Sequence, residues 1–149
     1  MKTIVVFVLG IMLFTTAMAQ KKKIIFVCEH GAAKSVIAAT YFNKLAKKRN
    51  INYVAECRGT YPDSVVSPAI KDGLTKDHVF DPTMQPRKLM ASDTTNVERI
   101  ILFTPLPTYM DGSIQTENWS QIENVDGDYS KRRDAIVKKI NELLDKLEK

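Results

Sequence analysis

Apolar and polar residues are grouped along the chain in a way that predicts alternating strands and helices. Lys23–Cys28 is a continuous β-branched and aromatic run, which is typical of a strand buried on both faces. Between Lys34 and Arg49 the apolar residues recur at helical spacing and predict an amphipathic helix. The last helix has the clearest pattern, and its apolar stripe consists of Ile136, Val137, Ile140, Leu143, Leu144 and Leu147.

Shorter runs complete the predicted order of elements. Three of them are predicted strands, at Ile51–Cys57, Val97–Phe103 and Trp119–Ile122. Pro68 predicts the first turn of a short helix, which Ser67 would cap and which would end near Gly73. Residues 75–97 contain two prolines and are predicted to be mostly irregular.

Strands that alternate with helices are typical of an α/β protein. The order predicts a three-layer αβα arrangement, flavodoxin-like, around a small parallel sheet of about four strands. In such sheets ligands bind beyond the carboxyl ends of the strands. We therefore expect the chemistry of this protein to lie just after the first strand.

The N-terminus has the pattern of a secretory signal peptide. Lys2 precedes an apolar run of 11 residues, Ile4–Phe14, and Ala17-Met18-Ala19 is a small-x-small cleavage pattern. This predicts a signal peptide at residues 1–19, a single mature domain at residues 20–149, and export to the periplasm or the medium. An uncleaved anchor remains the alternative, although a membrane-spanning helix needs roughly 20 apolar residues.

Charge and composition narrow the class of partner. The chain has a formal net charge of +5, and Lys2 is the one charged residue in the predicted signal peptide, so the mature net charge is +4. This mild excess favours a small anionic or phosphorylated substrate. The basic run Lys21–Lys23 is too short to predict nucleic-acid binding or stable membrane association. The two histidines and two cysteines lack metal-ligand spacing, so we expect neither a metal nor another cofactor.

The predicted loop after the first strand combines a thiol, small residues and a lysine. It reads Cys28-Glu29-His30-Gly31-Ala32-Ala33-Lys34-Ser35. Its backbone N–H groups can turn inward at a helix N-terminus and form an anion-binding nest, and Gly31 can adopt the positive φ that such a curl needs. The dipole, the amides and the Lys34 ammonium would each favour a Cys28 thiolate. Such a thiolate is a nucleophile toward phosphorus, and Ser35 could hydrogen-bond to it.

This loop resembles the Cys-x5-Arg-Ser loop of the low-molecular-weight protein tyrosine phosphatases and the related arsenate reductases. Further similar segments follow in the same order, at Cys57-Arg58-Gly59-Thr60, Ser67-Pro68-Ala69, Val97–Phe103 and Arg133-Asp134-Ala135-Ile136. The resemblance covers nearly all of residues 23–147. It implies the phosphatase fold and hydrolysis of phosphomonoesters, of the phosphotyrosine type, through a phosphocysteine on Cys28. It also implies phosphate binding by residues 29–33, that is Glu29, His30, Gly31, Ala32 and Ala33.

The sequence departs from this family at two functional positions. Lys34 replaces the loop arginine, and an ammonium cannot make the bidentate contact of a guanidinium. Our hypothesis is that Arg58 restores a guanidinium near the loop. The family's Asp-Pro general acid is also missing, and Asp126 is the best positional match, with Asp128 as its rival. Either aspartate could instead cap the last helix.

Three functions therefore remain open at the level of the sequence. The first is a phosphatase, the second is a weakly active or inactive anion-binding module on the same fold, and the third is a thiol redox enzyme of the arsenate reductase type. The third needs a resolving thiol, and Cys57 is the one other cysteine in the chain. Whether Cys28 and Cys57 form a disulfide is also left open by the sequence.

Overall fold

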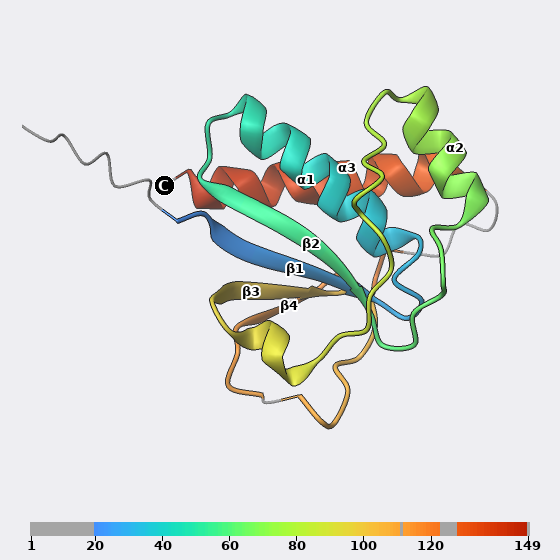
Figure 1. Ribbon diagram of the computed structural model, residues 1–149. Helices are drawn as coiled ribbons and strands as arrows, with labels where there is room; N and C mark the ends of the chain where they lie inside the picture. Colours follow the sequence, from blue (N-terminus) through green and yellow to red (C-terminus); the bar gives the residue numbers. More distant parts are fainter. Residues whose placement is uncertain (1–19, 111, 123–127, 149) are drawn as a thin grey trace, which may run out of the picture.

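The computed structural model of the chain describes residues 20–110, 112–122 and 128–148 (Figure 1). Its elements are β1 (Lys22–Cys28), α1 (Lys34–Lys48), β2 (Tyr53–Gly59), α2 (Pro68–Lys76), the 3-10 helix η1 (Ala91–Thr94), β3 (Val97–Leu102), β4 (Thr116–Asn118) and α3 (Tyr129–Leu147). The predicted signal peptide, residues 1–19, lies outside the described residues. Within the described ranges, no helix combines the length and the apolar character needed to cross a membrane.

The four strands form one parallel sheet in the order β2-β1-β3-β4 (Figure 1). The chain leaves β1 for β2 on one side and later returns to β3 on the other side. The strand order thus reverses at β1, and ligands bind at such a switch point in open α/β sheets. Because Cys28 is the last residue of β1, it lies at this point. The predicted α/β fold with a small parallel sheet is confirmed.

The two faces of the sheet are covered differently. Along β1, Phe26 and Cys28 face the core that α1, α2 and α3 cover, whereas Ile25 and Val27 face a smaller cluster. Figure 1 shows the three α-helices on the same side of the sheet. The smaller cluster is completed by Leu89, Met110, Leu106 and Ile114, which belong to the segment around η1 and the chain after β3. Among the described residues, this second layer is therefore irregular chain with one 3-10 turn.

Aromatic side chains pack together beneath α1 at the centre of the larger core. The Phe26 ring centroid lies 5.6 Å from that of Trp119 and 5.9 Å from that of Phe42. Trp119 is also in edge contact with Phe103, at 5.9 Å between ring centroids. Such pairs add to the hydrophobic stabilisation that burial provides. Trp119 therefore has a packing role.

Two local predictions were wrong. The last strand is Thr116–Asn118 and not Trp119–Ile122, because the chain turns after Trp119 pairs its N–H with the Leu102 carbonyl at 2.7 Å, and the Ile122 N–H donates back to the Trp119 carbonyl at 3.1 Å. The short helix does not end near Gly73 but continues to Lys76. Gly73 is a packing residue, since a Cβ atom there would lie 2.5 Å from the Tyr129 ring.

One partly buried carboxylate joins the three α-helices. Asp77, at the end of α2, accepts hydrogen bonds from the Tyr41 hydroxyl of α1 at 2.6 Å and from the Tyr129 hydroxyl of α3 at 2.7 Å. The Arg133 guanidinium donates to the same carboxylate at 3.0 Å. Burial opposes ionisation here, but these three donors outweigh it and lower the pKa of Asp77 to about 2.

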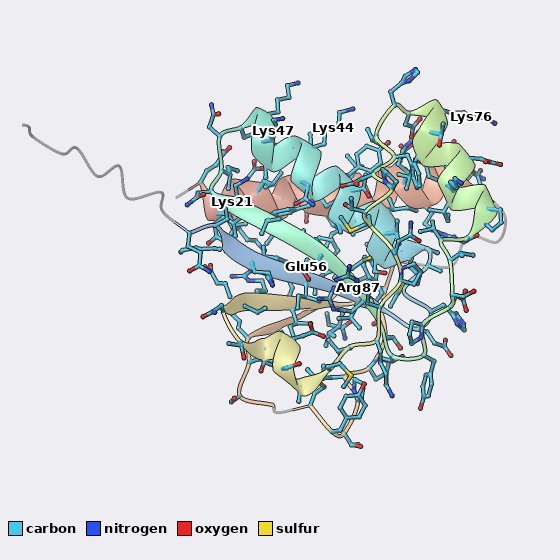
Figure 2. The ribbon with its side chains drawn as sticks, viewed as in Figure 1. Lys21, Lys44, Lys47, Glu56, Lys76 and Arg87 are labelled. Carbon is cyan, nitrogen blue, oxygen red and sulfur yellow. The ribbon has the colours of Figure 1, made fainter. Side chains whose placement is uncertain are left out.

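The outer faces of α1 and α2 carry solvated lysines such as Lys44 and Lys76 (Figure 2).

Candidate active site

The loop after β1 crosses the end of β2 in direct contact. Gly31 has φ of +60°, in the left-handed region that glycine adopts without strain. A Cβ atom on Gly31 would lie 2.9 Å from the Gly59 nitrogen, and one on Gly59 would lie 2.7 Å from the Gly31 nitrogen. Two glycines on neighbouring segments thus allow the loop to curl closely over the sheet.

Hydrogen bonds from the chain that follows β2 fix the orientation of the loop peptides. The pairs are Thr60 N–H to Cys28 O at 3.2 Å, Tyr61 N–H to Glu29 O at 2.8 Å, Asp63 N–H to His30 O at 3.0 Å, and Ser67 N–H to Ala32 O at 3.1 Å. Because these carbonyls point toward residues 60–67, the N–H groups of the same loop point to the opposite side. No acceptor within the described ranges takes a hydrogen bond from the N–H groups of residues 29–35.

The start of α1 extends this row of open donors. Ala33 is at the N-cap, where a side-chain acceptor is usual, and it makes no cap hydrogen bond. The first turn of α1 also contains no acidic residue. Its N–H groups therefore remain available, and together with those of the loop they form an anion-binding nest at the positive end of a helix.

Cys28 lies at the base of this nest. Its side chain is buried, with 6% exposed, and its Sγ atom lies 3.0 Å from the Oγ atom of the fully buried Ser35. The cavity above it has a volume of about 130 Å³ and is lined by Cys28, Glu29, His30, Ala33, Lys34, Phe103 and Thr104. One water molecule needs roughly 10–15 Å³ by this kind of measure, so a tetrahedral oxyanion fits. Across the described residues, no group of three His, Cys, Asp or Glu side chains is placed to hold a metal ion.

Lys34 reaches the same cavity from the first turn of α1. Its Nζ atom donates to the Ile122 carbonyl at 3.1 Å and lies 5.8 Å from the Phe103 ring centroid. Burial lowers the pKa of Lys34, the charge of a Cys28 thiolate raises it, and the nearby Arg132 guanidinium lowers it further. Arg132, in the first turn of α3, is thus a second cation that acts on this site, and the sequence analysis did not identify it.

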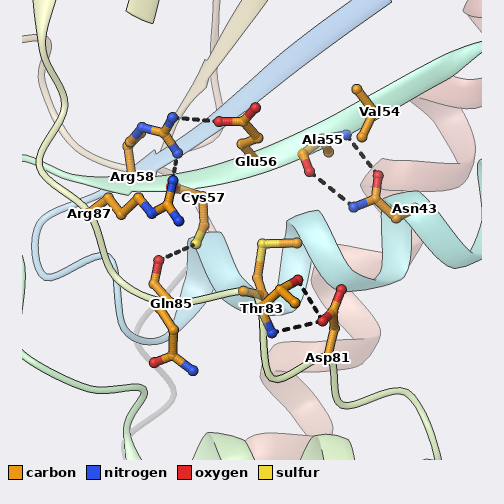
Figure 3. Close-up of a pocket in the computed structure, with 11 residues that line it drawn as sticks. Asn43, Val54, Ala55, Glu56, Cys57, Arg58, Asp81, Thr83, Gln85 and Arg87 are labelled. Atoms are coloured by element: carbon orange, nitrogen blue, oxygen red, sulfur yellow. Dashed lines mark hydrogen bonds and ion pairs between the residues drawn. The ribbon is translucent and has the colours of Figure 1, made fainter. Parts of the chain in front are cut away.

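Arg58 lies away from the thiol. Its guanidinium binds the Asp93 carboxylate at 2.9 Å and the Cys57 carbonyl at 2.8 Å, and only 8% of the residue is exposed. Figure 3 shows its further contact with the Glu56 carboxylate. It lines a different cavity, of about 310 Å³, at the outer edge of β2. Arg58 pairs in register with Val27, so its side chain and that of Cys28 leave the sheet on opposite faces. The structure thus does not bring the Arg58 guanidinium to the loop.

The remaining predicted residues have clear positions. Glu29 and His30 are exposed at the rim, where His30 Nδ1 lies 3.4 Å from an Asp63 carboxylate oxygen. Asp128 caps α3, since its side chain accepts a hydrogen bond from the Lys131 N–H at 3.2 Å. Asp126, the favoured general acid, lies outside the described residues and stays a prediction.

Cys57 is not placed to react with Cys28. Both thiols are free, and Cys57 is buried within β2, with its Sγ atom donating to the Gln85 carbonyl at 3.5 Å. Its register partner on β1 is Phe26, two residues before Cys28. Neighbouring strands lie about 4.8 Å apart and rise about 3.3 Å per residue, so the Cα atoms of Cys57 and Cys28 are about 8 Å apart. Disulfides need Cα atoms within about 7 Å. Burial also raises the pKa of Cys57 to about 11, which keeps it a protonated thiol.

Comparisons with known proteins agree on the fold. No protein-family model matches this sequence, and no curated protein has a significantly similar sequence. Among solved structures, the thioredoxin-dependent arsenate reductase of Corynebacterium glutamicum is 18% identical, with a TM-score of 0.69; the match covers 88% of this chain and 64% of that one.

Two phosphatases are similar over nearly their whole length. The low-molecular-weight protein tyrosine phosphatase of T. tengcongensis is 16% identical, with a TM-score of 0.70 and coverage of 85% of this chain and 99% of its own. A protein tyrosine phosphatase of Entamoeba histolytica is 15% identical, also with a TM-score of 0.70, and covers 86% and 96%. The chain therefore has the fold that low-molecular-weight phosphatases and arsenate reductases share.

Proposed function

We propose that this protein is a phosphatase that hydrolyses phosphomonoesters of the phosphotyrosine type through a phosphocysteine on Cys28. One observation carries the proposal. The N–H groups of residues 29–35 donate to no acceptor among the described residues, and this loop lines a cavity with a thiol that lies 3.0 Å from a buried hydroxyl. A row of backbone N–H groups that no protein acceptor takes, at a cavity and at the positive end of a helix, favours the binding of an anion. The tetrahedral substrate and product of phosphoryl transfer fit the size of the cavity.

The proposed reaction has two steps. In the first, the Cys28 thiolate attacks phosphorus, an S–P bond forms, and the P–O bond to the leaving alcohol breaks while Asp126 donates a proton to that oxygen. In the second, water attacks phosphorus, Asp126 takes its proton, and the S–P bond breaks to release phosphate and the thiolate. The amides of the loop would stabilise the charge on the equatorial oxygens, and each such donor is worth on the order of 10²–10³ in kcat. Ser35 would donate to the departing thiolate.

Lys34 is the cation of the cavity in this proposal. Its ammonium lines the same space as Cys28 and supplies a point charge for the phosphoryl group. Its bond to the Ile122 carbonyl also ties the cavity to the segment that precedes Asp126 in the sequence. Lys34 would thus both attract the anion and hold in place the chain that leads to Asp126.

The test is turnover of an aryl phosphate by the reduced protein, with Cys28→Ser and Cys57→Ala assayed in parallel. We expect activity in the parent protein and in Cys57→Ala, and none in Cys28→Ser. Turnover that survives Cys28→Ser would overturn the proposed phosphocysteine route. Loss of activity in Cys57→Ala, with the fold retained, would instead point to a thiol exchange reaction.

A second candidate is an anion-binding module with little or no turnover. It is favoured by Lys34, because an ammonium that already donates to a carbonyl cannot follow the phosphoryl oxygens as a bidentate guanidinium does. It predicts that phosphate raises the melting temperature while no aryl phosphate is hydrolysed.

The redox alternative needs a reactive second thiol, and the burial and register of Cys57 give it no support.

Export remains part of the proposal on the strength of the N-terminal pattern. The Ala17-Met18-Ala19 site predicts a mature protein that begins at Gln20. The mass of the protein recovered from the periplasm or the medium of a bacterial host tests this. A protein that retains residues 1–19 and remains with the membrane would show an uncleaved anchor instead.

A further inference from the structure

A second hollow adjoins the cavity of Cys28. It has a volume of about 560 Å³ and is lined by Glu29, Thr60, Tyr61, Lys88 and residues 104–109, a set we call the tyrosine groove. Glu29 and Thr104 line both spaces, so the groove is continuous with the cavity. The groove is more than four times the volume of the cavity and is of the size of a small-molecule site.

The groove exists because the second layer over the sheet is irregular chain. The segment after β3 runs through Pro105 and Pro107, and its Tyr109 hydroxyl donates to the Leu89 carbonyl at 2.9 Å. That bond holds the Tyr109 ring in place while 49% of the residue remains exposed. Tyr61, on the opposite segment, is 77% exposed. Two aromatic side chains with large exposed areas and two prolines therefore form the walls of the groove.

Glu29 places a negative charge where the two spaces meet. No basic group among the described residues lies within ion-pair distance of its carboxylate: His30 is beside Asp63, Arg58 is held by Glu56 and Asp93, and the Lys34 ammonium donates to the Ile122 carbonyl. A phosphoryl dianion in the cavity would be repelled by this carboxylate. A positive charge on the substrate, close to its phosphoryl group, would remove that repulsion. Lys88 lines the groove but not the cavity.

We propose that the tyrosine groove binds the leaving group of the substrate, and that this group has an aromatic or apolar body with a positive charge near the phosphoryl oxygen. The apolar body would lie against Tyr61, Tyr109 and the prolines, where a cation also gains from the aromatic faces. The charge would lie beside Glu29. This inference deepens the proposed function, since it rests on a phosphoryl group being bound at Cys28.

Non-hydrolysable phosphonates test the charge preference without requiring turnover. Binding of inorganic phosphate, a neutral ortho-methyl phenylphosphonate and an ortho-ammoniomethyl phenylphosphonate, whose ammonium lies next to the phosphonate group, would be measured by calorimetry on the reduced protein. We expect the cationic phosphonate to bind about fivefold tighter than the neutral one, the equivalent of about 1 kcal/mol for an exposed charge pair. Glu29→Gln should bring the two affinities together.

Matched variants separate the groove from general charge effects. Asp72→Asn removes one exposed carboxylate of α2 that does not line the groove, and should retain the preference. Tyr61→Ala should weaken both phosphonates by similar factors. If phosphate binds but the two phosphonates bind equally, or Glu29→Gln keeps the preference, the inference is overturned while the phosphatase proposal stands. If neither phosphate nor a phosphonate binds, both fail.

Discussion

The Sγ atom of Cys28 lies 3.0 Å from the Oγ atom of Ser35, although six residues, 29–34, separate them in the chain. The pair is buried, so the hydroxyl has a defined partner. A hydrogen bond to an ionised group contributes about 1.5–3 kcal/mol. In the proposed reaction it stabilises the thiolate that leaves when phosphocysteine is hydrolysed.

Ser35→Ala is therefore expected to slow the second chemical step by about ten- to a hundredfold, given that about 1.4 kcal/mol is a tenfold change in rate. Rapid-quench kinetics with an aryl phosphate should show a retained burst of the alcohol product and a reduced steady-state kcat. Ser64→Ala removes an exposed hydroxyl outside the cavity and is the control. Equal steady-state rates in the two variants would exclude the assigned role of Ser35.

Lys34 should make phosphate binding sensitive to alkaline pH. Burial holds its pKa below the usual 10.5, so as pH rises the ammonium loses its proton earlier than an ordinary lysine does, and its attraction for the anion is lost. Calorimetric titration of phosphate binding against pH should show an alkaline decline that Lys34→Arg removes. Lys44→Arg, a solvated lysine on α1, should keep the decline. A decline that persists in Lys34→Arg would assign the titration to another group.

The sequence predicts the thiol loop well because its chemistry is local. Strand β1, the loop and the start of α1 are consecutive, so an apolar run, a glycine and a helical pattern are enough to place Cys28, Gly31 and Lys34 together. The carbonyl bonds from residues 60–67 could not be read from that segment. They depend on how the chain after β2 returns over the loop, yet they are what turns the N–H groups inward.

Arg58 and the tyrosine groove show why the rest of the site was harder to predict. Side chains along a strand alternate between the two faces of the sheet, so a register change of one residue would move Arg58 to the face of Cys28. In the structure Arg58 pairs with Val27, and its side chain therefore lies on the other face. Tyr61 and Tyr109 are 48 positions apart in the numbering, and only the packing of irregular chain beside β3 makes them two walls of one groove. Such long-range placement leaves no periodic signal in the sequence.

The glycine contact between the loop and β2 predicts a sharp difference between two substitutions. Gly31→Ala forces a side chain into the left-handed region and against the Gly59 nitrogen, and should lower the free energy of unfolding by about 1–2 kcal/mol or more. Gly112→Ala is the control, because a Cβ there meets no described atom within 4 Å, and it should change stability by less than about 0.5 kcal/mol. Urea denaturation measures both, and equal stability losses would contradict the close approach.

Asp77 should make the fold sensitive to acid. Its folded pKa of about 2 lies below its ordinary value of 3.8, so its stabilising effect is complete above pH 4 and is lost as pH falls toward 2. Asp77→Asn should be less stable than the parent at neutral pH and should lose less further stability between pH 4 and 2. Thermal melts at several pH values measure this, with Asp72→Asn as the control. Parallel pH curves for Asp77→Asn and the parent would refute the shift.

The central claim is that Cys28 receives a phosphoryl group within the amide nest, and trapping that intermediate tests it most directly. The reduced protein would be mixed with an aryl phosphate, quenched in acid within the burst phase and digested, and the peptides would be analysed by mass spectrometry. We predict one added phosphoryl group on the peptide that contains Cys28, in the parent and in Cys57→Ala, and none in Cys28→Ala. Turnover without that adduct, or with a phosphoryl group on another residue, would contradict the mechanism.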